Sequence, residues 1–580
     1  MLEETQVLES NTLIEEEERY HVTEIQKKTS LLGSVTSLLQ DAYFHWSQRL
    51  YQSVVQKKDS IAYYENILSN ATSYEQWASA ATILDQFTGK EKWKNEVASP
   101  HYDYELVQTK LEQLKRARKS GDLSMIIFLL RTSLSRSIGD IGKPMLYGYT
   151  HIGTKKLIDN YIDEVVKTLN MVCDTECEDV STKIKYEFFT NTRQSFGRTA
   201  LMLSGGASFG LNHVGVLKCL YEHKLLPRII SGASSGSIIA AIICTHTEEE
   251  FLKMLNPSGI NLNTFARPGD DNSYFKRFSR FLKHGVLFDV DVLIEMLREN
   301  IGDYTFLEAY NRTRRILNIP VSSSTVFEMP RLLNYLTAPD VIIWSAVAAS
   351  CAVPCIYKSA PLLAKDKAGN TVPWAPTGHR CIDGSVENDL PMKRLSELFN
   401  VNHFIVCQVN PHVIPFMHRS LTPSPARRFV NWVLNLACSE IQHRMNQLYE
   451  LGIMRSLFYR LEAIMSQRYS GDITIVPDIK YAEFINVIEN PTPQTFLDAI
   501  LRGERAIWPK ISIIRNHCQI ELCIDEMIYQ LRLQMLEEGS ANSTSTDCLA
   551  LETRKTRSSL PSSTYRSCTD FKTGYGMTHS

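Results

Sequence analysis

Two glycine-rich turns, each between a short apolar run and a helical pattern, constrain the fold more than any other feature of this sequence. The first apolar run, 199–203, leads into SGGASFG at 204–210, and the second, 226–230, leads into SGASSG at 231–236. An apolar run, a glycine turn and a helix, repeated once, is the pattern of a βαβ unit with parallel strands. The sequence therefore predicts an α/β fold built on a parallel sheet.

The second turn fits the pattern G-x-S-x-G, with Ser234 at its centre and Gly232 and Gly236 on either side. A sharp strand-to-helix turn exposes such a serine, and the two glycines let neighbouring backbone pass close to it. The helix predicted at 237–243 directs its free N–H groups and positive dipole end toward the hydroxyl. Ser234 is therefore the candidate nucleophile.

The first turn offers backbone donors to an acyl-transfer reaction. The amides of Gly205, Gly206 and Ala207 are candidates to stabilise the oxyanion of a tetrahedral intermediate. A serine nucleophile also needs a base, and Asp383 followed by Gly384 forms a tight turn downstream. An aspartate with its ordinary pKa of about 4 is a poor base in water, so this role requires a dry pocket.

Three ordered segments, SGGASFGLNHVGVLK, GASSG and DGSVENDLP, resemble the patatin-like acyl hydrolases, and most of all the fungal and plant triacylglycerol lipases of that family. The resemblance covers roughly residues 60–515. It implies a parallel-sheet core with helices on both faces, a Ser234–Asp383 dyad without histidine, and no metal or cofactor. It also matches the oxyanion loop to Gly205–Ala207, and four further motif glycines to Gly210, Gly232, Gly236 and Gly384.

The resemblance further implies hydrolysis of triacylglycerol at a lipid-droplet surface or the cytosolic face of the endoplasmic reticulum, with acyl transfer to a lysophospholipid as a side activity. A phospholipase, or mainly a lysophospholipid acyltransferase, is the alternative. Two departures from the family pattern, Ala207 and Phe209, leave open a catalytically weak lipid-droplet scaffold. Since a phenylalanine cannot neutralise a phosphate, we expect Phe209 to favour a neutral ester over a phospholipid head group.

Other catalytic schemes remain as alternatives. A Ser-His-Asp triad needs a late histidine, and GGASFG does not fit the G-x-G-x-x-G of a dinucleotide site. We interpret His213, His379 and the pair His284 and Asp289 as structural. The late histidines available to a triad are His403, His412, His418, His443 and His517.

Composition excludes several classes of protein. The net charge of −2 and the absence of a basic recognition motif argue against nucleic-acid binding. Thirteen widely spread cysteines without zinc-like spacing indicate reduced thiols in a cytosolic compartment. The opening MLEETQVLES does not resemble a signal peptide, and no run of 18 uncharged apolar residues predicts a spanning helix.

Changes in composition divide the chain into five parts. Aromatic residues at helical spacing in 31–55, and arginines among apolar positions in 427–461, fit either core packing or contact with a lipid surface. The predicted parts are a disordered acidic head at 1–30, a helical region at 31–195, the catalytic core at 196–410, an extension packed on the core at 411–536, and a disordered Ser/Thr-rich tail at 537–580.

Overall fold

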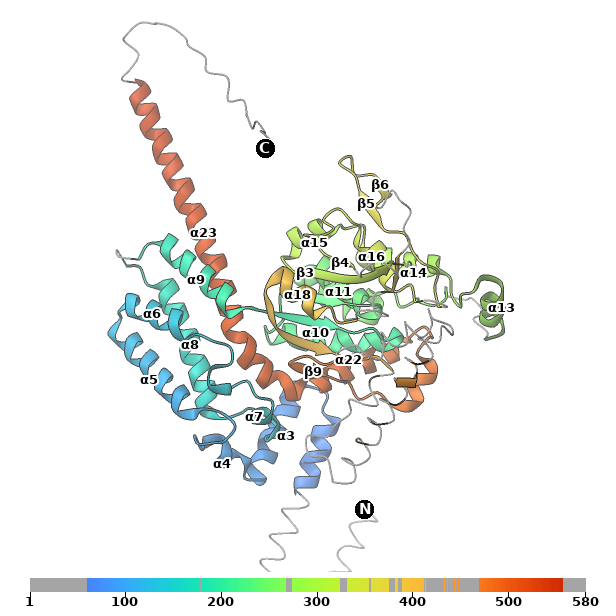
Figure 1. Cartoon of the computed structure of the whole chain (residues 1–580), viewed down its shortest axis with the longest axis horizontal. Coiled ribbons are helices and arrows are strands. Elements are labelled where there is room, and N and C mark those ends of the chain that lie inside the picture. The colour runs from blue at the N-terminus through green and yellow to red at the C-terminus, as the bar shows by residue number, and fades with distance from the viewer. Residues whose placement is uncertain are drawn as a thin grey trace, which may run out of the picture.

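Figure 1 shows the computed structural model of the chain. The residues that it describes are 60–177, 180–267, 274–323, 331–353, 356–374, 381–383, 389–411, 413 and 469–555, with isolated positions between 432 and 447. The predicted acidic head, the helix expected at 31–55, most of the segment expected to be helical at 427–461, and the end of the tail lie outside the described residues.

A mixed sheet with mostly parallel strands forms the core, in the order β4-β3-β2-β1-β8-β9, with β7 also paired to β3. The α/β class is thus confirmed, and the sheet departs from parallel only around β3. The parallel strands are β1 (Arg198–Leu203), β2 (Ile229–Gly232), β3 (Ile316–Ser323), β8 (Val401–Cys407) and β9 (Ile473–Ile475). The antiparallel strands on β3 are β4 (Arg331–Leu333) and β7 (Cys381–Asp383), and β5 (Leu363–Lys365) and β6 (Thr371–Pro373) form a separate hairpin.

Helices cover both faces of the sheet, as predicted. Because side chains alternate along a strand, Leu201 and Leu203 of β1 join the main core, whereas Ala200 and Met202 join a second core on the other face. The main core is shared with α10 (Asn212–Glu222), α11 (Ser235–Thr245) and α22 (Pro493–Ile507), and the second core with α18 (Met392–Phe399).

Helices α10 and α22 cross at two glycines. A side chain at Gly215 would overlap the backbone of Ile500, and one at Gly503 would overlap the backbone of Asn212. The two helices can therefore approach closely only because neither glycine carries a Cβ atom.

An all-helical region precedes the sheet and packs beside it (Figure 1). Helix α5 ends and α6 begins at Ser120-Gly121-Asp122, where Gly121 takes φ 73° and the Asp122 carboxylate accepts the Met125 N–H at 3.0 Å. The helices of this region are α3 (Tyr74–Phe87), α4 (Lys90–Asn95), α5 (Tyr104–Ser120), α6 (Leu123–Ser133), α7 (Met145–Gly148), α8 (Lys156–Asp174) and α9 (Thr182–Phe196). Later helices are α12 (Glu248–Met254), α13 (Tyr274–His284), α14 (Val290–Ile301), α15 (Phe306–Thr313), α16 (Ile343–Ser350) and α23 (Ile511–Lys555).

Helix α16 begins at Ile343, and before it the Thr337 hydroxyl donates to the Leu332 carbonyl at 2.7 Å and closes the turn after β4. Helix α23 passes the predicted boundary at 536 and continues to Lys555, into the stretch predicted to be disordered. Extending an existing helix needs no new nucleation, so the polar sequence can follow the packed part.

A buried charge cluster joins the helical region, the sheet and α23. Glu521 of α23 lies 2.9 Å from Arg136 and 3.2 Å from Arg193, and it accepts the Thr199 N–H at 2.9 Å. Arg193 also pairs with Asp525. All four charged side chains are exposed by 10% or less. We call these five residues the junction cluster; it holds the start of β1 against both flanking helical parts.

Candidate active site

Ser234 lies on a strained turn between β2 and α11. Its backbone takes φ 48° and ψ −125°, a combination that residues with a Cβ atom rarely adopt and that costs about 1–3 kcal/mol. The Ser234 N–H donates to the Ser350 hydroxyl of α16 at 3.2 Å, and that hydroxyl donates to the Pro320 carbonyl of β3 at 3.0 Å. The turn is thus held by its own strand and helix and by a neighbouring helix.

The two motif glycines beside Ser234 sit where no side chain fits. A Cβ atom at Gly232 would lie 2.7 Å from the Ser237 nitrogen, and one at Gly236 would lie 2.6 Å from the Ser204 carbonyl oxygen. Backbone therefore passes close to both glycines, as the G-x-S-x-G pattern predicts.

The first glycine turn lies directly against the nucleophile. A Cβ atom at Gly205 would be 3.3 Å from the Ser234 Cβ, and Gly206 and Ala207 both have positive φ, 157° and 49°. The Gly205 amide donates to Asp389 at 3.0 Å, so it is already engaged. Within the described part of the chain, the amides of Gly206 and Ala207 have no acceptor. Of the three amides expected to face an oxyanion, Gly205 thus has an acceptor here, whereas Gly206 and Ala207 have none among the described residues.

Gly210, further along the same turn, packs against the helix that follows Ser234. A Cβ atom there would lie 2.6 Å from the Ser235 Oγ. Phe209 is 5% exposed and packs on Phe484, with ring centroids 5.2 Å apart. Phe209 is not among the residues that line the apolar cavity beside Ser234, so the expectation that it favours a neutral ester stays a prediction.

Asp389 is a carboxylate that the sequence analysis did not single out. It is 3% exposed, and its two oxygens accept the Gly205 N–H at 3.0 Å and the Asn410 side-chain amide at 2.7 Å. Burial raises the pKa of Asp389 from 3.8 to about 6, against the opposing effect of these two hydrogen bonds. The signal available in the sequence was its place inside DGSVENDLP, next to the predicted base.

The predicted base, Asp383, ends strand β7 on the β2 side of β3. Ser231 of β2 pairs with Asn318 of β3, and three residues further along β3, Val321 pairs with Asp383. Val321 also pairs with Arg331 of β4, which occupies the other edge of β3. The Asp383 backbone therefore lies in line with β2, on the same side of β3. Along the direction of β3, it is level with the position three residues beyond Ser231. Gly384 lies outside the described residues.

The described histidines are placed as structural residues. His213 is fully buried in α10, 2.9 Å from the Ser204 carbonyl and 3.0 Å from the Cys407 sulfur, and burial lowers its pKa to about 4. His403 and His517 stack with ring centroids 4.6 Å apart. His403 pairs in register with Thr199, at the opposite end of β1 from the glycine turn.

The other histidines named in the sequence analysis differ in their placement. Asp289 caps α14 and pairs with Arg280, so the spacing of His284 and Asp289 reflects helix ends. His443 is exposed. The positions His379, His412 and His418 lie outside the described residues.

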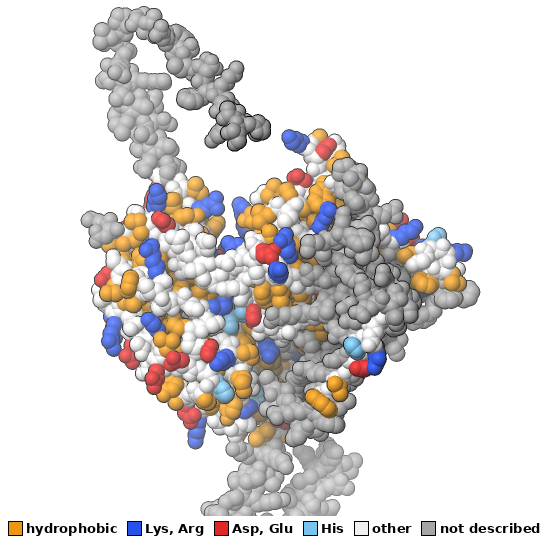
Figure 2. Space-filling view, viewed as in Figure 1, with side chains coloured by type: hydrophobic (Ala, Val, Ile, Leu, Met, Phe, Trp, Pro, Cys, Tyr) orange, Lys and Arg blue, Asp and Glu red, His pale blue; other side chains and the backbone are white. Residues whose placement is uncertain are grey.

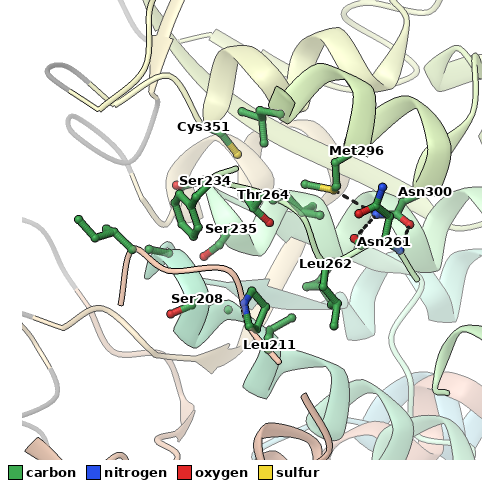
Figure 3. Close-up of a pocket in the computed structure, with 18 of the residues that line it drawn as sticks. Ser208, Leu211, Ser234, Ser235, Asn261, Leu262, Thr264, Met296, Asn300 and Cys351 are labelled. Atoms are coloured by element: carbon green, nitrogen blue, oxygen red, sulfur yellow. Dashed lines mark hydrogen bonds between the residues drawn. The ribbon is translucent and has the colours of Figure 1, made fainter. Parts of the chain in front are cut away.

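An apolar cavity opens beside Ser234, and its empty space, including the open space at its mouth, is about 800 Å³. Figure 3 shows Ser234 and Cys351 at one side of this cavity, and Asn261 and Asn300 at the opposite side. Most of its wall is aliphatic or aromatic, with Leu262, Phe265, Leu293, Met296, Ile356 and Tyr357 among the lining residues. Such a cavity suits a hydrocarbon chain attached to the group that Ser234 reaches.

Polar side chains hold the loop that forms one wall of the cavity. The Asn300 side chain accepts the Asn261 N–H at 2.8 Å and donates to the Asn261 carbonyl at 2.8 Å. Tyr357 donates to the Thr264 carbonyl at 2.9 Å, and Asn490 accepts the Phe265 N–H at 2.8 Å. The loop at 260–266 is thus fixed from three directions, and the polar groups facing it are satisfied.

No group of three or more histidine, cysteine, aspartate and glutamate side chains among the described residues is placed to bind a metal ion. None of the helices in the described part is both long enough and apolar enough to cross a membrane.

Comparison with known proteins assigns the two main parts of the chain. Residues 54–194, which include α3 to α8 and most of α9, match a domain of unknown function, DUF3336, and residues 201–395 match the patatin-like phospholipase model. Triacylglycerol lipase ptl3 of Schizosaccharomyces pombe is 42% identical over 78% of this chain and 94% of its own length. The chain belongs to the patatin-like family.

Further patatin-like relatives are longer than this chain. Triacylglycerol lipase 4 of Saccharomyces cerevisiae is 41% identical over 81% of the chain, and triacylglycerol lipase SDP1L of Arabidopsis thaliana is 40% identical over 80% of it. The chain spans about half the length of these two relatives, 53% and 58%. The patatin-like match contains both glycine turns, Asp383 and Asp389.

Proposed function

We propose that this protein is a carboxylic ester hydrolase that releases fatty acids from neutral lipid, and specifically a triacylglycerol lipase. One observation carries the proposal: a strained serine, Ser234, stands between an apolar cavity and a loop in which the Gly206 and Ala207 amides have no acceptor among the described residues. The names of the three relatives, all triacylglycerol lipases, support the choice of substrate.

The reaction begins when the Ser234 hydroxyl attacks the ester carbonyl carbon while its proton passes to the base. The amides of Gly206 and Ala207 donate to the oxyanion of the tetrahedral intermediate. Its collapse breaks the bond to the alcohol, which leaves with the proton, and gives an acyl-serine. Water then adds to the acyl carbon as the base takes its proton, and a second collapse releases the fatty acid and restores the Ser234 hydroxyl.

Asp383 is the base in this scheme. Support comes from its backbone position, since the register of β7 on β3 brings it to the level of the turn that carries Ser234. Asp389 is the other acid close to this turn. Because both Asp389 oxygens already accept hydrogen bonds from Gly205 and Asn410, we assign it to holding the oxyanion loop in place.

The lipid-droplet surface, reached from the cytosolic side, is the site of action we propose. The apolar cavity supports a substrate with long hydrocarbon chains, and such substrates are concentrated at lipid surfaces. An acyl-serine intermediate can also be attacked by the hydroxyl of a lysophospholipid, which gives acyl transfer with the same residues.

The test measures fatty acid released from emulsified triolein by the purified full chain, with Ser234→Ala, Asp383→Asn and Asp389→Asn alongside. We expect Ser234→Ala and Asp383→Asn to lose activity by roughly 10⁴-fold or more, and Asp389→Asn to retain a measurable rate. Ser235→Ala is the matched control for the nucleophile, since it removes a neighbouring hydroxyl and leaves the Ser234 turn intact.

Each other outcome changes a named part of the proposal. If Asp389→Asn is inactive and Asp383→Asn is not, Asp389 is the base. If the protein is inert on triolein but acylates a lysophospholipid in a parallel reaction, the site is correct and water is not its main acceptor. If folded wild-type protein does neither and a fluorophosphonate does not label Ser234, the protein is a scaffold.

A further inference from the structure

Helix α13 is a basic amphipathic helix that lies outside the catalytic cavity. Its sequence, YFKRFSRFLKH, combines aromatic and aliphatic residues with lysine and arginine and contains no acidic residue. At 100° per residue, the apolar residue types occupy one arc of about 120°, and the lysines and arginines fall outside it. The apolar positions are 274, 275, 278, 281 and 282.

The end of this helix exposes apolar and basic side chains together. Leu282 is 69% exposed and Phe281 is 37% exposed, although both belong to the apolar arc. Lys283 and His284 beside them are exposed as well. Figure 2 shows this part of the molecule standing out at the right-hand side, with hydrophobic and basic side chains on its surface. Helices with this combination lie in the interface of anionic membranes.

The inner side of α13 packs against the aromatic wall of the cavity. The Arg277 guanidinium lies over the Phe288 ring, 5.2 Å from its centroid, and the Phe288 ring lies 5.1 Å from that of Phe265, which lines the cavity. The Phe288 N–H donates to the carbonyl of Ile356, another lining residue, at 3.0 Å. Two layers of side chains therefore lie between the cavity and any surface on which α13 rests.

We propose that α13 docks the protein on an anionic phospholipid surface. Phe281 and Leu282 enter the boundary between head groups and acyl chains, and Lys283 faces the anionic head groups. Charge complementarity selects this occupant: Arg280 pairs with Asp289 and Arg277 packs over Phe288, but Lys283 at the exposed end of this acid-free helix is attracted to anionic lipid and repels a basic partner. The proposal rests on the lipase function proposed above, since it explains how the cavity is brought to its substrate.

The test is co-sedimentation of the full chain with vesicles of phosphatidylcholine, with and without phosphatidylserine. Leu282→Asn is expected to weaken binding about tenfold, the effect of losing part of one buried leucine. Lys283→Gln is expected to weaken binding about fivefold, and only on vesicles that contain phosphatidylserine. Leu536→Asn, which changes a leucine of α23 that is 64% exposed, is the matched control and should bind as wild type does.

Equal binding of wild type and Leu282→Asn would overturn the proposal. So would a lower molecular mass of Leu282→Asn by light scattering, because α13 would then contact a second copy of the chain. Hydrolysis of soluble p-nitrophenyl butyrate separates this proposal from the lipase function: we expect equal rates for wild type and Leu282→Asn. If wild type binds vesicles through Leu282 but hydrolyses no ester, the docking proposal stands and the lipase function fails.

Discussion

Replacing Asp389 by asparagine tests the electrostatics of the candidate site. The side chain is 3% exposed and is held by the Gly205 amide and the Asn410 side chain. Burial makes the charged form unfavourable, so the pKa rises from 3.8 to about 6 in the folded protein. At 1.36 kcal/mol per pKa unit, this difference makes ionised Asp389 cost about 3 kcal/mol of folding free energy.

The sign of the pH dependence follows from the raised pKa. Between about pH 4 and pH 6 the folded protein binds the Asp389 proton more tightly than the unfolded chain does, so the contribution of Asp389 to stability falls as pH rises. Asparagine has no proton to lose. The free energy of unfolding of Asp389→Asn, measured relative to wild type, should therefore rise by about 3 kcal/mol from about pH 4 to about pH 7.

Urea unfolding of both proteins across this pH range measures the difference, because all other titrating groups cancel. Asp366→Asn is the control: hydrogen bonds from the backbone of its own turn lower the pKa of Asp366, so its ionisation should contribute no change over the same range. A free-energy difference between Asp389→Asn and wild type that stays constant from about pH 4 to pH 7 would refute the reasoning.

Three further substitutions test packing, the junction cluster and the Ser234 turn. Gly503→Ala should lower the free energy of unfolding by about 3 kcal/mol, because its methyl group meets the Asn212 backbone; urea unfolding measures this. Glu521→Gln should lower the free energy of unfolding by about 3–5 kcal/mol, because it removes the buried negative charge that Arg136 and Arg193 share. Thermal unfolding measures this loss, with the exposed Glu440→Gln as the control. Ser350→Ala removes the acceptor of the Ser234 N–H, a hydrogen bond worth about 1 kcal/mol, so kcat/KM on a soluble ester should fall about fivefold. An unchanged kcat/KM would mean that the Ser234 turn keeps its geometry without this hydrogen bond.

The turn at Ser234 was predictable because its determinants are local. A strand, two glycines and a helix within a dozen residues define its geometry, and the structure places β2 and α11 around Ser234 as the pattern predicts. Sequence reasoning also anticipated the structural role of His213.

What sequence reasoning missed depends on residues that are distant along the chain. The hydrogen bond from Gly205 to Asp389 joins two segments 184 positions apart, and it withdraws one of the three amides expected in the oxyanion hole. Strand β7 is three residues long and pairs antiparallel with β3. So short a strand has no periodicity to detect, and its partner is chosen by the fold.

The junction cluster determines how this chain can be divided. The two family matches suggest a cut between residues 194 and 201, yet Arg193 lies before that cut and its partners Glu521 and Asp525 lie after it. A fragment beginning at 201 would keep both carboxylates in α23 and lose both arginines. The two regions that the family models match are therefore not independently stable units. If the first region is exchanged between relatives, the face of α23 that contacts it must be exchanged as well.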